Sequence, residues 1–104
     1  MSLTDLQARA QAIRKKYDEA NARDGHQKWD GVDYAAGFVG DVGDLVKLVM
    51  AKSGKRRGDD VDAKLQHELG DCLWSLLVIA NHYDIDLEKA FYPTMAELDE
   101  RLAL

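Results

Sequence analysis

Residues 65–80 decide the fold, and they read LQHELGDCLWSLLVIA. Apolar side chains recur in this stretch at the three- and four-residue spacing of a helix and form one broad face. Trp74 and Val78 fall on the opposite side, so the helix predicted over about residues 60–82 is apolar almost all round. Such a helix needs neighbours on every side, and three further helices are too few to surround it. We therefore predict a homodimer or a homotetramer.

Three other segments carry helical periodicity. The first starts at Leu3, the second runs over about residues 32–51, and the fourth over about residues 87–102. No strand alternation, repeat or linker is present. The 104 residues are therefore predicted to form a single domain, 1–104, with an all-α fold. We expect an antiparallel four-helix bundle whose helices are joined by short connections. Oligomerisation would complete the bundle.

Several residues mark the expected helix ends. Pro93 lies inside the fourth segment and either kinks the helix or begins a restarted one. Residues that favour helix caps stand where the segments begin or end: Ser2 with Asp5, Gly54, Asp59 or Asp60, and Asp86.

Two matching acidic pairs lie on the second and third helices. Asp41 and Asp44 occur in DVGD, and Glu68 and Asp71 occur in ELGD, so each pair shares one helix face. At about 100° per residue, each pair lies beside the apolar stripe of its helix, where unpaired charge is costly. The acids are either a solvated stripe or a convergent site, and the apolar surroundings of both pairs favour the site.

A convergent site of four carboxylates needs a cation, because like charges raise pKa values and destabilise the fold. Mg²⁺, with Mn²⁺ as a substitute, matches ligands that are all oxygen. Iron is disfavoured because no Glu-x-x-His motif is present. Gly43 and Gly70 are costly inside helices, and we interpret them as permitting close helix approach beside the acids.

The acidic segments resemble the two signatures of MazG-like, all-α nucleoside triphosphate pyrophosphohydrolases. Those enzymes carry Glu-x-x-Glu on one helix and Glu-x-x-Asp on the next, and residues 40–46 and 67–74 are similar to them. Residues 85–90 also resemble the opening of the fourth helix of the family. The resemblance implies a Mg²⁺-dependent enzyme, dimeric or tetrameric. It would cleave the α–β phosphate bond of a nucleoside triphosphate, giving a monophosphate and pyrophosphate.

The resemblance also implies roles for the four acids. Asp41, Asp44, Glu68 and Asp71 would hold one or more Mg²⁺ ions that bridge the triphosphate oxygens. Glu68 is our choice of general base, because its longer side chain can reach an attacking water. The first two acids are aspartates where the family usually has glutamates. The family often carries a lysine and an asparagine on its last helix, and neither stands at the corresponding positions here, near Thr94 and Leu98.

Six other residues are candidates for substrate binding. Trp29 either stacks on a nucleobase or fills space in the core. Asn81 either recognises the edge of a base across a subunit interface or has a capping or surface role. Trp74 is expected to pack at a subunit interface. A basic cluster between the two acidic helices either grips phosphates or forms a solvated connection; its members are Lys52, Lys55, Arg56 and Arg57.

The composition narrows the class of protein. A formal net charge of −5 argues against nucleic-acid binding and against an anionic membrane surface. The single Cys72 permits no internal disulfide, and no apolar run reaches the roughly 18 residues of a membrane helix, so we expect a cytoplasmic protein. A non-enzymatic helical dimer with a degenerate metal site is the alternative to the enzyme.

Overall fold

The structure is a computed structural model that describes residues 2–103. It contains α1 (Leu3–Arg23), α2 (Gly31–Lys52), α3 (Val61–His82) and α4 (Leu87–Leu102). All four predicted helices are present close to their predicted bounds, and no strand occurs within residues 2–103. The predicted all-α fold is confirmed.

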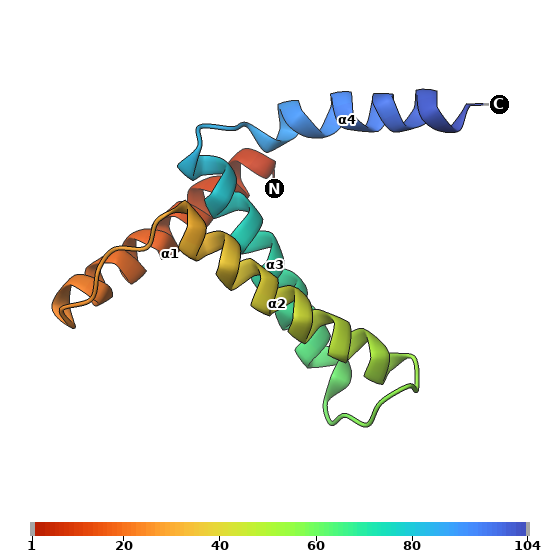
Figure 1. The fold of residues 1–104 in the computed structure, drawn as a ribbon, viewed down its shortest axis with the longest axis horizontal. Helices are drawn as coiled ribbons and strands as arrows, with labels where there is room; N and C mark the ends of the chain where they lie inside the picture. Colours follow the sequence, from red (N-terminus) through yellow and green to blue (C-terminus); the bar gives the residue numbers. More distant parts are fainter. Residues whose placement is uncertain (1, 104) are drawn as a thin grey trace.

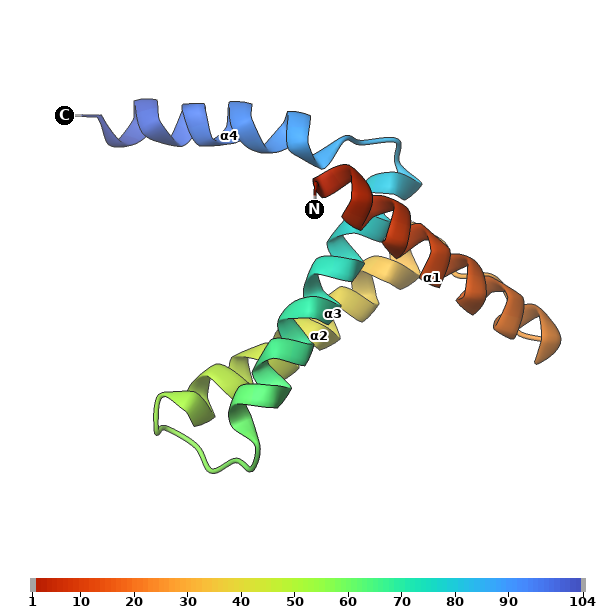
Figure 2. The same cartoon turned by 180° about the vertical axis from the view of Figure 1, so that it is seen from behind.

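The long antiparallel pair of α2 and α3 is the body of the molecule (Figure 1). α1 packs against the C-terminal half of α3, and α4 leaves the end of α3 and points away from the other helices (Figure 2). One chain therefore leaves the bundle open, and half-exposed apolar side chains remain on α2, α3 and α4.

The core lies where α1, α2 and α3 meet. Val78 is completely buried there, and Tyr34, Leu77 and Ala10 are nearly so. The indole Nε1 of Trp74 donates a hydrogen bond of 3.1 Å to the backbone oxygen of Ala10. The expectation that Trp74 packs at a subunit interface is thus wrong, because α1 of the same chain covers that side of α3.

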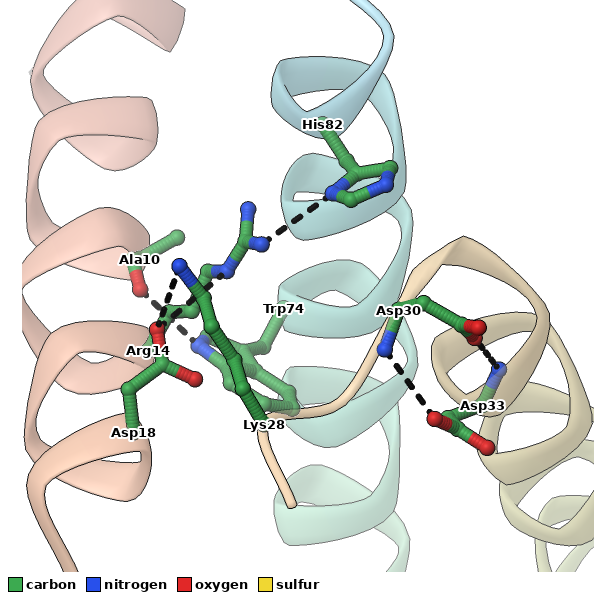
Figure 3. Close-up of polar contacts among 8 residues, drawn as sticks. All are labelled: Ala10, Arg14, Asp18, Lys28, Asp30, Asp33, Trp74 and His82. Atoms are coloured by element: carbon green, nitrogen blue, oxygen red, sulfur yellow. Dashed lines mark hydrogen bonds and ion pairs between the residues drawn. The ribbon is translucent and has the colours of Figure 1, made fainter. Parts of the chain in front are cut away.

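A buried arginine strengthens the junction of α1 with α3 (Figure 3). The guanidinium of Arg14 lies 3.1 Å from Nδ1 of His82 and 5.1 Å from the ring centroid of Tyr34. Oδ2 of Asp18 lies 3.9 Å from Nε of Arg14, and this carboxylate, with the ring of His82, compensates the guanidinium for its lost hydration. The same carboxylate oxygen lies 3.7 Å from Nζ of Lys28. These contacts hold α1 against the end of α3 and against the loop that leads to α2.

Reciprocal capping boxes begin α1 and α2. The side chain and backbone of Ser2 pair with those of Asp5, as predicted, and Asp30 pairs with Asp33 in the same way (Figure 3). Asp86 caps α4 by accepting from the backbone N–H of Lys89.

The start of α3 differs from the prediction. Asp60 occupies the N-cap position, but its φ of 50° is left-handed and its side chain makes no capping hydrogen bond. A capping carboxylate is aimed at the helix by extended backbone, which this residue lacks. Asp60 therefore marks the boundary of α3 without stabilising it as a cap.

The end of α2 and the course of α4 through Pro93 agree with what the sequence predicts. Gly54 has φ +78°, and the N–H of Lys55 donates to the Met50 oxygen at 2.8 Å, which closes α2 in a Schellman motif. α4 continues through Pro93 without a restart. The hydroxyl of Thr94 donates to the oxygen of Ala90 at 2.7 Å.

No helix within residues 2–103 combines the length and the hydropathy that crossing a membrane requires.

We expect Val78→Ala to lower the free energy of unfolding by about 2 kcal/mol, because it removes two buried methyl groups and leaves a cavity. Urea titration followed by circular dichroism measures the change. Val32→Ala is the matched control: Val32 is 73% exposed, and its loss should change stability by no more than about 0.5 kcal/mol. Equal effects of the two substitutions would contradict the placement of the core.

Candidate metal centre

Three of the four predicted ligands come together between α2 and α3. Carboxylate oxygens of Asp41, Asp44 and Glu68 all lie within 4.8 Å of one another. Asp41 and Asp44 are one turn apart on α2, and Glu68 faces them from the antiparallel α3. Asp41 and Glu68 are half-buried while Asp44 is exposed, so the cluster is open to solvent on one side.

Asp71 stands beside this group and is engaged elsewhere. Its Oδ2 lies 3.2 Å from Nε2 of His67, one turn earlier on α3. The negative charge of Asp71 nevertheless acts on Glu68, whose pKa it helps to raise. The structure therefore brings the fourth predicted ligand to the edge of the cluster and not into it.

The cluster carries an electrostatic cost when no cation is bound. Burial, and then the charges of Asp41, Asp71 and Asp44, raise the pKa of Glu68 above its ordinary value. Its Oε1 is buried and has no hydrogen-bond partner among the described residues. An orphaned carboxylate oxygen among other carboxylates suits a hard divalent cation such as Mg²⁺.

A hydroxyl that was not predicted from the sequence holds one of the acids. The Oγ of Ser75 donates a hydrogen bond of 3.2 Å to Oδ2 of Asp41 across the helix pair. Ser75 is buried, and it is the only hydroxyl residue of α3. A single hydroxyl in an apolar helix, one turn after Asp71, was a signal that could have identified it.

The glycines beside the acids have no tight packing partner in this chain. A side-chain carbon added at Gly43 or Gly70 would meet no other atom within 4 Å. The interpretation that they permit close helix approach is therefore wrong within one chain, because both glycines lie on the outer sides of the helix pair.

An aromatic pocket of about 350 Å³ adjoins the acids. Ring centroids of Tyr17 and Trp74 lie 5.6 Å apart, those of Trp74 and Tyr34 6.1 Å, and those of Tyr34 and Trp29 5.4 Å. Asp41 belongs both to this pocket and to the carboxylate cluster. The remaining lining residues are Asn21, Gly37 and Ser75.

The structure separates the predicted substrate contacts. Trp29 lies in the aromatic pocket, and so does Trp74, which was expected to pack at a subunit interface. Asn81 is not among the residues that line the pocket. It lies six residues beyond Ser75, which is roughly 9 Å along α3.

The predicted basic residues lie at the end of the helix pair where α2 ends and α3 begins. Lys52 lies eight residues beyond Asp44, roughly 12 Å along α2, and forms an ion pair of 2.6 Å with Asp62. Lys55 lies beside an apolar groove at the end of α2, and Arg56 and Arg57 are exposed in the following loop. Their contact with phosphate stays a prediction.

A comparison with models of protein families identifies the family of the chain. Residues 33–102 match the MazG nucleotide pyrophosphohydrolase domain. The chain belongs to the MazG family. The matched region contains α3, α4 and nearly all of α2, including the four acids, whereas α1 and Trp29 lie outside it. Comparisons with curated proteins and with solved structures gave no match. Membership supports a nucleotide pyrophosphohydrolase as the coarse description of activity.

We expect Glu68→Gln to raise the melting temperature of the chelated protein at neutral pH, because it removes a carboxylate whose pKa is raised in the folded state. The penalty of an acid with a raised pKa is complete above the folded pKa and disappears as the pH falls below the unfolded value of 4.5. The advantage of the variant should therefore shrink on acidification, as measured by differential scanning fluorimetry from neutral pH to below 4.5.

The control for this measurement is Glu97→Gln, which changes an exposed carboxylate on α4. Added Mn²⁺ should raise the melting temperature of the wild type and of the control, but not that of Glu68→Gln. A variant no more stable than the wild type in chelator at neutral pH would contradict the assigned electrostatic cost.

Proposed function

We propose that this MazG domain is a Mg²⁺-dependent enzyme that cleaves the α–β phosphate bond of a nucleoside triphosphate. Its products are a nucleoside monophosphate and pyrophosphate, and its role is removal of non-standard or excess nucleotides. The observation that carries the proposal is the sharing of Asp41 between the carboxylate cluster and the aromatic pocket. A single ligand with a flat ring and a metal-bound phosphate chain fits these two neighbouring environments.

All four acids are metal ligands in this proposal, and one of them is also the general base. Asp41, Asp44, Glu68 and Asp71 would hold Mg²⁺, which when bound neutralises charge on the phosphate oxygens. Asp71 reaches the cation by leaving His67, to which it is paired in the described structure. Glu68 also serves as general base: its buried Oε1 would face the cation, and its other carboxylate oxygen would take a proton from the attacking water. The water oxygen bonds to phosphorus while the anhydride bond breaks.

The pocket supplies the binding surface for the base. Trp29 is 45% exposed and Tyr17 56%, although both rings contact other aromatic rings of the pocket. Rings left this exposed can stack on a further flat ring, which gains about 1–3 kcal/mol per base. The base would enter between α1 and α2, and its phosphates would extend toward Asp41.

Incubation of the protein with a panel of nucleoside triphosphates and Mg²⁺ tests the activity. Chromatography should show monophosphate and pyrophosphate in equal amounts. Glu68→Gln and Asp71→Asn should lower kcat by at least about 100-fold, because they remove the base or a ligand of the metal. Asp59→Asn, in the exposed loop before α3, is the control and should retain full activity.

Two results would contradict this assignment. Diphosphate with orthophosphate would reject the α–β bond while keeping a hydrolase. No turnover of any nucleotide, together with no thermal shift in Mg²⁺ or Mn²⁺, would favour a non-enzymatic helical dimer with a degenerate site.

We further propose that a second copy of the chain completes the bundle. Six large apolar side chains lie, at about 100° per residue, on the face of the α2–α3 pair that points away from α1. They are 37–52% exposed, which is too much apolar surface to leave in water on adjacent helices. The six are Val42, Val46, Val49, Leu69, Leu73 and Leu76.

Leu73→Glu should convert the assembly to a monomer, because it buries a charge at the centre of the proposed interface. Sedimentation velocity measures the change in mass, and circular dichroism verifies that the helices remain. Val32→Glu adds the same charge at an exposed position outside the six-residue face and should leave the mass unchanged. A monomeric wild type would overturn the proposal.

A further inference from the structure

The aromatic pocket contains one polar side chain for which the proposed function has no use. Asn21 lines the pocket from α1, together with Tyr17 one turn earlier. It lies outside the part of the chain that matches the MazG domain, so neither the family nor its acidic motifs assign it a role. It is the only carboxamide among the lining residues.

Three other polar groups that line the pocket are already engaged. Ser75 donates to Asp41, Asp41 belongs to the carboxylate cluster, and the indole N–H of Trp74 donates to the backbone of Ala10. Among residues 2–103, no side-chain hydrogen bond of the structure involves the amide of Asn21. The amide is therefore available to a ligand in the pocket.

The backbone of Asn21 is firmly held even though its amide has no partner. Its carbonyl accepts the N–H of His26 at 2.8 Å, and Gly25 turns the chain there with φ +74°. This Schellman motif closes the last turn of α1. The amide thus projects from a fixed point and is not carried by a mobile end of the chain.

We propose that Asn21 is the specificity-determining residue of the pocket and that it hydrogen-bonds the edge of the nucleobase. The inference rests on the proposed function and adds to it the group that distinguishes one base from another. Stacking on Trp29 and its neighbours cannot do so, because every base has an aromatic face. A carboxamide offers a donor beside an acceptor, and the edges of the bases differ in the order of these groups.

Gln7, on the same helix, serves as a matched comparison. It also carries a carboxamide and has a similar degree of burial, but it does not line the pocket. Substitution of Gln7 therefore measures the effect of losing a carboxamide of α1 that lies outside the pocket.

The test uses equilibrium binding and does not require hydrolysis. Trp29 and Trp74 are the only tryptophans of the chain, and both line the pocket, so their fluorescence reports its occupancy. The wild-type protein with Mn²⁺ is titrated with α,β-methylene analogues of ATP, GTP, CTP and UTP. Inorganic tripolyphosphate, followed by calorimetry, is the probe that has phosphates but no base.

Asn21→Ala should weaken the preferred analogue about tenfold, the usual cost of a lost hydrogen bond, and leave tripolyphosphate unchanged. Asn21→Asp should change the order of preference among the four bases, because a carboxylate accepts but cannot donate. A structural role would not reorder the bases. Gln7→Ala should keep both the affinity and the order of the wild type.

Unchanged affinities and order in both Asn21 variants would overturn the inference, as would a wild type whose fluorescence no analogue quenches. An equal loss of tripolyphosphate binding would also overturn it, since the whole site would then be disturbed. If the analogues bind as described but no triphosphate is hydrolysed, the proposed function fails and the assignment of Asn21 stands.

Discussion

The packing of α2 against α3 is the constraint on which the rest of the molecule depends. It holds carboxylate oxygens of Asp41, Asp44 and Glu68 within 4.8 Å of one another, which their mutual repulsion opposes. Apolar contacts along the pair and the core around Val78 outweigh that repulsion. A bound cation would turn this net repulsion into net attraction, because the same three negative charges are then drawn to a common positive centre.

Much of the fold could be read from local sequence. The periodic apolar stripes and the caps at Ser2, Gly54 and Asp86 set the helices, because these signals act within one or two turns. The relation of α1 to α3 could not be read in this way. It depends on Trp74 and Arg14, each of which pairs with residues more than sixty positions away along the chain.

For the candidate site, too, some features could be predicted from local sequence and others could not. The spacing of the acidic pairs predicted that they share helix faces, and three of the four converge. The pairing of Asp71 with His67 depends on rotamers, and the contact of Ser75 with Asp41 depends on the register of two helices. Neither rotamers nor register follow from hydrophobic periodicity, which fixes a face but not an axial position.

The position of Asp41 has a consequence for how ligands would influence one another. Its carboxylate lines the aromatic pocket, accepts from Ser75 and stands among the clustered acids. A molecule in the pocket that displaces this carboxylate changes the affinity of the cluster for a cation. Thermodynamic linkage then requires the cation to change the affinity of the pocket by the same factor. One side chain of α2 would in this way set the cooperativity between the two sites.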